Sequence, residues 1–232
     1  GVSNPLVREQ LFNRMERVAT TPDDQVWYLL ALADFQMRMQ RPSAAVRQYQ
    51  RILTAPVLAA VQYAVGPTTR QAAMEATSRL KQIVGESDDP SIYEQFETEA
   101  ARKLIQQTGV PMPDPETLVE LARQYPCASA APVARLAAAE VYAGAGNMVK
   151  AVTQLRRAYV EATESVLVAR VVGRLAELYE QREQPNLAYR VLRRAQAEYG
   201  ALAPLRGSIA VDIEDWINQL AQHGAATRHL PR

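Results

Sequence analysis

The residues best suited to metal, acid–base or nucleophilic chemistry are few in this chain. Its two histidines, His223 and His229, are six residues apart near the C-terminus, whereas a pair that binds a metal from one helix face is spaced i, i+4. The single cysteine, Cys127, cannot form an internal disulfide or a multi-cysteine zinc site, and no histidine base accompanies it in the predicted core. We therefore expect no metal centre and no cysteine- or serine-based catalysis.

Two further groups have residue types that occur in active sites. Glu94 and Glu97 share a helix face and follow the Asp88–Asp89 pair, but acidic residues at this spacing are common on exposed helices. The segment 144–146, Gly-Ala-Gly, lacks the following Lys-Ser or Lys-Thr pair and the preceding strand of a phosphate-binding loop, so it is interpreted as a turn between helices. The sequence thus favours a non-enzymatic protein without a cofactor.

The charge balance argues against a dedicated nucleic-acid binder. Lysine and arginine total 26 and aspartate and glutamate total 25, so the net charge is +1. Arginine outnumbers lysine by 23 to 3, and arginine binds RNA phosphates and stacks on bases, so RNA binding stays an alternative.

With 48% hydrophobic residues the chain can bury a core, and it has no apolar run of about 18 residues that would insert into a membrane.

Hydrophobic spacing is helical along almost the whole chain, and no segment shows the alternation of a strand. Near the C-terminus, one apolar stripe with a polar back comprises Ile209, Ile213, Trp216, Ile217 and Leu220. Residues 55–66 are apolar and are interpreted as either a short helix or a packed loop. The other helices are predicted near 5–19, 22–40, 42–54, 67–84, 90–108, 114–125, 130–144, 147–162, 165–183, 185–199 and 207–223.

Prolines mark the starts of several predicted helices. Pro22, Pro90 and Pro115 each follow a Thr or Asp and precede polar residues, which is the pattern of an N-cap followed by proline at the first helical position. Pro42 and Pro185 are expected to begin helices in the same way.

A five-residue pattern occurs twice at an offset of 37 residues, and a more divergent third copy lies nearer the N-terminus. Its small residues suit positions where two helices approach closely, and its larger residues fill the gaps between them. The copies are Tyr142, Gly146, Ala151, Leu155 and Ala158; Tyr179, Glu183, Ala188, Leu192 and Ala195; and Gln36, Gln40, Ala45, Tyr49 and Ile52.

This pattern resembles the tetratricopeptide repeat (TPR) family, in which each repeat is a pair of helices. The match is good over 130–200, fair over 26–54 and weak elsewhere, and the consensus tryptophan is replaced by Leu29, Arg135 and Val172. The resemblance implies an all-α fold, a right-handed α-solenoid of antiparallel helix pairs with a C-terminal capping helix. The expected division is a degenerate TPR-like region at 1–126, TPR-like repeats plus the capping helix at 127–223, and a flexible tail at 224–232.

Two observations bear on the origin of the chain. The run Leu121–Ser129, followed by a repeat, looks like bacterial envelope TPR proteins and, more loosely, like TPR-like segments fused to quinoprotein-type β-propellers. The chain begins at Gly1 rather than Met, so it is either complete or a segment cut from a longer protein. Both the compartment, bacterial cytoplasm or periplasm, and the oligomeric state stay open.

The resemblance also implies where a partner would bind, because the first helices of TPR pairs line a concave groove. Asp34, Glu140 and Glu177 occupy equivalent positions on these helices, and Arg170 and Arg174 add positive charge. We expect these five residues to form a mixed-charge groove; the alternative is that the charged rows pair with one another and only solvate the surface. Glutamate stands where the carboxylate clamp of the family has asparagine, so capture of an acidic C-terminus by that clamp is not expected.

The sequence therefore predicts a non-enzymatic protein–protein interaction scaffold that binds an unknown protein or peptide. Two alternatives come from other classes: a helical accessory domain of a larger, propeller-bearing or enzymatic protein, and an RNA-binding helical repeat protein. A second charged row, on the second helices of the pairs, is the next surface to test and contains Arg51, Arg157 and Arg194.

Overall fold

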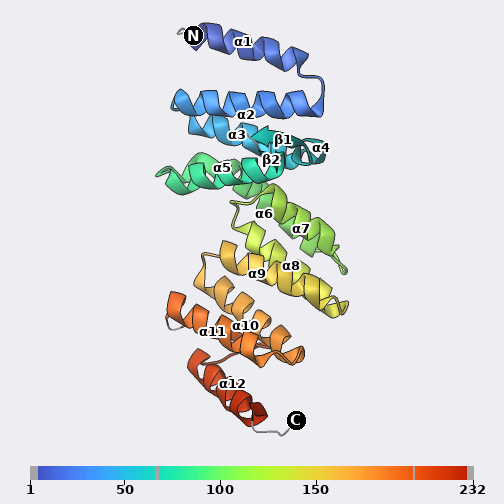
Figure 1. Ribbon diagram of the computed structural model, residues 1–232, viewed down its shortest axis with the longest axis vertical. Helices are drawn as coiled ribbons and strands as arrows, with labels where there is room; N and C mark the ends of the chain where they lie inside the picture. Colours follow the sequence, from blue (N-terminus) through green and yellow to red (C-terminus); the bar gives the residue numbers. More distant parts are fainter. Residues whose placement is uncertain (1–4, 66–67, 201, 229–232) are drawn as a thin grey trace. The chain divides into compact units, whose positions relative to one another are not determined.

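The computed structural model describes residues 5–65, 68–200 and 202–228. Helices make up most of it, which confirms the predicted helical character of the chain (Figure 1). The chain divides into two compact units, Gly1–Arg102 with Arg123–Ala128, and Lys103–Ala122 with Ser129–Arg232. The division falls within α6 (Glu94–Thr108) and α7 (Pro115–Gln124), and each unit is described separately below.

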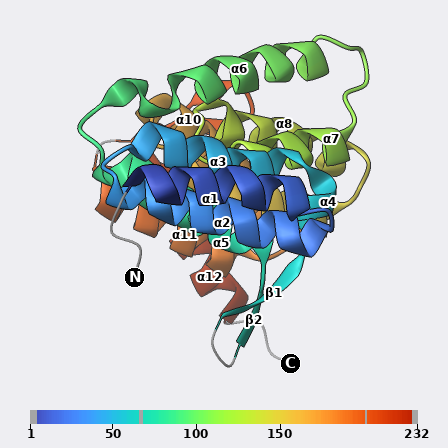
Figure 2. The ribbon, with the colours of Figure 1, turned by 90° about the horizontal axis from the view of Figure 1, so that it is seen from above.

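In the first unit, α2 (Pro22–Arg38) packs on α3 (Pro42–Thr54), and α3 packs on α5 (Ala72–Glu86). Between α3 and α5 the chain forms a short helix and an antiparallel ribbon, which projects away from α2 and α3 in Figure 2. The remaining elements are α1 (Pro5–Val18), α4 (Pro56–Ala59), β1 (Gln62–Val65), β2 (Thr68–Gln71), the 3-10 turn η1 (Pro90–Tyr93) and the first part of α6.

A polar network lies inside the first unit at one side of α3. The side chain of Gln50 is buried, and its Nε2 donates to the carbonyl of Gln124 at 2.7 Å. The hydroxyl of Tyr93 donates to Gln50 Oε1 at 2.9 Å. Because one amide joins α3, η1 and the segment Arg123–Ala128, the network fixes pieces of chain that are distant in sequence.

The second unit is a series of helices in which each packs on the next: α8 (Ala130–Gly144), α9 (Met148–Glu161), α10 (Ser165–Gln181), α11 (Pro185–Tyr199) and α12 (Ile213–Arg228). A second ribbon, β3 (Leu205–Arg206) and β4 (Ile209–Ala210), joins α11 to α12, and β3 contacts α10. Among the described residues, no helix is long and apolar enough to cross a membrane.

The turns α2–α3, α8–α9 and α10–α11 share one backbone geometry. Each has three residues, and the middle one, Gln40, Gly146 or Glu183, has a positive φ of 55°, 76° or 56°. In each, the following residue donates its N–H to the carbonyl five residues earlier, over 2.8–2.9 Å, as in a Schellman motif; the donors are Arg41, Asn147 and Gln184. Glycine adopts this conformation without strain, whereas glutamine and glutamate adopt it because the flanking helices fix the turn.

The core positions of the repeated pattern are buried as predicted. The three equivalent alanines, Ala45, Ala151 and Ala188, are fully buried, and so are Ala158 and Ala195. The predicted proline starts of α2, α3 and α11 are confirmed as well. The repeated local sequence pattern therefore produces three similar helix hairpins.

Two predicted helices start later than the sequence suggested, because each is preceded by part of a ribbon. The helix expected from 67 begins at Ala72, after four ladder pairs between β1 and β2, and the region 55–66 contains both α4 and β1. The helix expected from 207 begins at Ile213. Ile209 lies in β4 and is 68% exposed, so its assignment to the apolar stripe was wrong. The predicted helix at 90–108 is also divided, into η1 and α6.

The rest of the C-terminal stripe is buried as predicted. Trp216 is 1% exposed, α12 packs on α11, and the guanidinium of Arg206 lies 5.0 Å from the centre of the Trp216 ring. The helix runs to Arg228, so most of the expected tail at 224–232 is helical backbone; residues 229–232 lie outside the described part.

The β3–β4 ribbon is held closely against α10. Gly173 lies under the ribbon: a Cβ at this position would be 1.9 Å from the carbonyl oxygen of Leu205. The N–H of Gly207, at the ribbon turn, donates to Glu177, and Arg206 pairs with Glu180 at 3.2 Å. Positions 173, 177 and 180 share one face of α10, so the ribbon covers that face.

One ion pair of the second unit is nearly buried. Arg135 on α8 donates from Nε to Glu161 at 2.6 Å, and from Nη1 to Gln154 at 3.1 Å, both on α9. A hydrogen-bonded cation therefore joins α8 and α9 at this position. Breaking such a pair leaves a charge without compensation in the interior, which destabilises proteins strongly.

Candidate functional site

The five residues predicted to form a groove fall in both units. Asp34 is in the first unit, exposed on α2, and it accepts a hydrogen bond from the hydroxyl of Tyr49 at 3.4 Å. It lines a cavity of about 370 Å³ together with Trp27 and Tyr63, whose rings pack edge to face at 5.9 Å. Asp34 is therefore in an aromatic environment that the sequence did not predict.

The second unit brings Glu140, Arg174 and Glu177 together. Arg174 on α10 donates to Glu140 on α8 and to Glu177 on its own helix, both at 3.0 Å. Glu140 is 48% exposed, whereas Glu177 is largely covered and also holds the ribbon turn at Gly207. Arg170 is exposed, and no ion pair of Arg170 is found within the described part of the chain.

This cluster contains two kinds of residue. Arg174 and Glu177 are partly buried and hold α8, α10 and the ribbon together, so they contribute to the fold. Glu140 and Arg170 keep accessible charge at the surface. A partner at this face would meet mainly the latter two.

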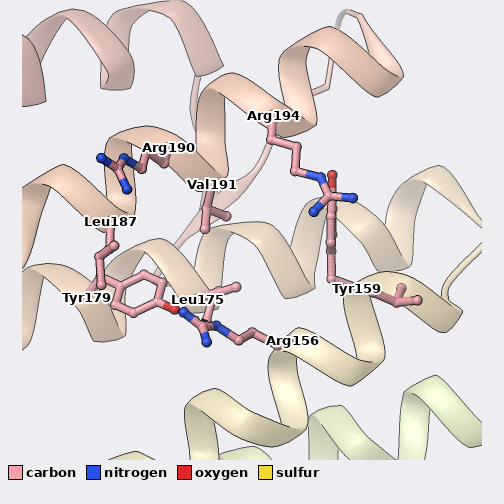
Figure 3. Close-up of a pocket in the computed structure, with 9 residues that line it drawn as sticks. Arg156, Tyr159, Leu175, Tyr179, Leu187, Arg190, Val191 and Arg194 are labelled. Atoms are coloured by element: carbon pink, nitrogen blue, oxygen red, sulfur yellow. Dashed lines mark hydrogen bonds between the residues drawn. The ribbon is translucent and has the colours of Figure 1, made fainter.

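A pocket in the second unit combines arginine, tyrosine and aliphatic side chains in a way that was not predicted from the sequence. It has a volume of about 390 Å³ and is lined by residues of α9, α10 and α11. Figure 3 shows the guanidinium groups of Arg156, Arg190 and Arg194 around it, with Leu175 and Val191 between them. The full lining is Arg156, Tyr159, Val160, Leu175, Tyr179, Leu187, Arg190, Val191 and Arg194.

The two tyrosines of this pocket hold two of the arginines. Arg156 donates from Nε to the hydroxyl of Tyr179 at 2.8 Å, and its guanidinium lies 5.8 Å from the centre of the same ring (Figure 3). Arg194 lies 5.5 Å from the centre of the Tyr159 ring and donates to Glu198 at 2.7 Å. Such cation–π and hydrogen-bond contacts orient a flexible arginine side chain.

Tyr159 and Glu198 form a coupled pair at the edge of the pocket. The Tyr159 hydroxyl donates to Glu198, and burial, followed by this hydrogen bond, raises the pKa of Tyr159. The hydrogen bonds from Tyr159 and then Arg194 lower the pKa of Glu198, so its carboxylate stays charged. Glu198 therefore neutralises Arg194 and leaves Arg156 and Arg190 as the cations that face the pocket without a carboxylate.

A signal for this pocket was present in the sequence. Leu187, Arg190, Val191 and Arg194 follow i, i+3, i+4, i+7, so one face of α11 mixes apolar and cationic residues. Of the predicted second-helix row, Arg194 lines the pocket, whereas Arg157 is exposed elsewhere on α9.

In the described ranges, no group of three or more His, Cys, Asp or Glu side chains is placed to hold a metal ion. His229 lies outside those ranges, and His223 is part of the α12 backbone. Cys127 is half-buried and, together with Tyr93 and Glu97, lines a cavity of about 430 Å³ in the first unit.

Comparisons with models of known protein families, with curated proteins and with solved structures find no match for this chain.

Proposed function

We propose that this protein is a non-enzymatic scaffold that binds a partner protein or peptide through the exposed faces of its helix hairpins. The observation that carries the proposal is the open pocket of the second unit, in which aliphatic side chains lie beside oriented arginines. Arginine and tyrosine are enriched where proteins bind one another, because both combine a large contact area with directional hydrogen bonds.

The repeated hairpins support the same proposal. Three turns with one geometry and fully buried alanines at equivalent positions fit stacked helix pairs, and we propose the right-handed TPR-type solenoid as their architecture. The stability of such a stack comes from its buried positions. Exposed residues such as Arg190 and Arg170 are not needed for that stability, so they can serve to recognise the partner.

A second surface for this function is the predicted groove on the first helices. There, Glu140 and Arg170 present opposite charges that would set the register of an extended partner more than its affinity. Arg174 and Glu177 belong to this surface as well, but their reversal would also disturb the ribbon on α10.

Affinity capture with surface variants tests the proposal. The immobilised chain is incubated with an extract of its source organism, and retained proteins are compared for the parent, Arg190→Glu, Arg170→Glu and Arg182→Glu. Arg182 is an exposed arginine of the α10–α11 turn outside the pocket lining, so it controls for the loss of positive charge.

We expect at least one partner that the parent and Arg182→Glu retain and that Arg190→Glu or Arg170→Glu loses, with direct binding confirmed for the purified pair. Circular dichroism must show that every variant stays folded. The proposal is overturned when all retained proteins bind the four chains equally, or when none binds the purified parent.

A further inference from the structure

The pocket of the second unit carries a charge pattern that identifies the chemistry of its occupant, given the proposed function. None of its nine lining residues is acidic, and three are arginines. Arg194 is compensated by Glu198, whereas Arg156 donates its hydrogen bond to a tyrosine hydroxyl rather than to a carboxylate. Arg190 is exposed, and no ion pair with it is found in the part of the chain that the structure describes. Two guanidinium groups thus border the pocket without a carboxylate.

Arginine beside an aliphatic surface favours a carboxylate attached to an apolar body. The guanidinium fork matches a carboxylate in a bidentate geometry, and charge-assisted hydrogen bonds of this kind are among the strongest in proteins. Leu175, Leu187 and Val191 provide the apolar wall between the arginines. A volume of about 390 Å³ is within the range of ligand pockets and leaves room for an aliphatic side chain.

The burial of Tyr159 and Tyr179 argues against single-stranded nucleic acid as the occupant. Recognition of bases depends on free aromatic faces on which they stack. Here Tyr179 is 2% exposed and Tyr159 is 8% exposed, and a guanidinium already lies over each ring. The lining thus offers cations and aliphatic surface but no open stacking platform.

We propose that the pocket between α9 and α11 binds an acidic segment of a partner protein, in which Glu or Asp side chains flank an aliphatic residue. The carboxylates pair with Arg156 and Arg190, and the aliphatic side chain packs on Leu187 and Val191. This surface differs from the mixed-charge face of α8 and α10, where Glu140 would repel such a segment.

Fluorescence anisotropy with defined probes tests the inference. The probe is a labelled ten-residue peptide, Gly-Ser-Glu-Leu-Glu-Glu-Leu-Glu-Ser-Gly, and the controls are the same peptide with glutamine for glutamate and a labelled poly-uridine oligonucleotide of equal length. Binding is measured at low and at physiological salt for the parent, Arg190→Gln, Arg190→Glu and the control Arg182→Glu.

We expect the acidic peptide to bind the parent more weakly as salt rises, because exposed charges are screened. Arg190→Gln should weaken binding by roughly tenfold, the effect of one hydrogen bond to a charged group, and Arg190→Glu by more. Arg182→Glu should bind within about twofold of the parent, which is the change expected from long-range charge alone.

Three results would overturn the inference: equal binding of the acidic and glutamine peptides, equal binding by Arg190→Glu and the parent, or binding of the oligonucleotide in preference to the peptide. Each is distinguishable from failure of the proposed function. A captured partner that is lost with Arg170→Glu would keep the scaffold proposal while the acidic segment is discarded.

Discussion

The close contact between α10 and the β3–β4 ribbon gives a prediction whose sign can be worked out. A Cβ at position 173 would lie 1.9 Å from the carbonyl oxygen of Leu205, and 2.8 Å from its backbone N and C atoms. Ordinary contact begins at 3.4 Å, so the ribbon would have to move by more than an ångström. Backbone atoms cannot rotate away as a flexible side chain does, and the contact is therefore expected to break rather than adapt.

Two opposing effects set the magnitude for Gly173→Ala. Alanine is more favourable than glycine inside a helix by about 1 kcal/mol. Overpacking a close contact costs about 1–3 kcal/mol, and a backbone obstacle belongs to the upper part of that range. We therefore expect the free energy of unfolding of the second unit to fall by about 1–2 kcal/mol. The ribbon carries Arg206, which lies over Trp216, so that ring should become more exposed.

Urea unfolding followed by tryptophan emission measures this change. The chain has two tryptophans, so the Trp27→Phe background leaves Trp216 as the sole reporter, and it reports on the second unit. The matched control is Gly144→Ala in α8, where a Cβ meets nothing within 4 Å. This control should be equal to the parent or slightly more stable. Our reasoning is refuted when Gly173→Ala is as stable as Gly144→Ala and the emission of Trp216 does not change.

Three further outcomes are expected. Trp216→Ala should lower the free energy of unfolding by about 3–5 kcal/mol in a urea titration, because the ring is 1% exposed. Ala151→Leu should cost roughly 1–3 kcal/mol through overpacking, whereas Ala197→Leu, at an exposed position of α11, should be nearly neutral in the same titration. Burial, and secondly the charge of Asp34, raises the pKa of Tyr49 to about 12 from an ordinary 10.0. As pH rises, the Tyr49 hydroxyl therefore loses its proton at a lower pH in the unfolded chain than in the folded protein. The contribution of Tyr49 to stability should be present below about pH 10 and fall as pH rises toward 12.

Each of these outcomes has its own result that would contradict it. Unchanged stability in Trp216→Ala would show that α12 does not dock on the second unit. A fully tolerated Ala151→Leu would mean that the repeat register is wrong. For Tyr49, the pH dependence of urea unfolding is compared with that of Tyr49→Phe; identical curves above pH 10 would contradict the raised pKa.

The sequence by itself determined the helix hairpins. Their signals are local: a proline at the first helical position, an apolar stripe of helical period, and small residues where helices meet. The equivalence of Gly146 and Glu183 was read from spacing alone, and both adopt a left-handed φ in the structure. Burial of Ala151 and Trp216 followed from the same periodicity.

The ribbons were decided by tertiary structure. A strand of two residues carries too little alternation to be recognised, and only the Gly207-Ser208 pair at the turn hinted at a hairpin. The pairing of Leu205 with Ala210 is stabilised by the fit of the ribbon over Gly173 on a helix more than thirty residues earlier. Because that fit depends on two distant backbones approaching each other, no local pattern in the sequence could show it.

The same holds for the candidate site. Arg193 and Arg194 are consecutive on α11, yet Arg194 borders the pocket while Arg193 contacts Tyr189 and Gln196 outside it. Helical period places the two side chains on different faces. Which face meets α9 is settled by the packing of three helices, because a pocket exists only where the side chains of neighbouring elements leave a space. The positions of the arginines along the helices thus follow from the sequence, whereas the tertiary structure decided which of them border one pocket.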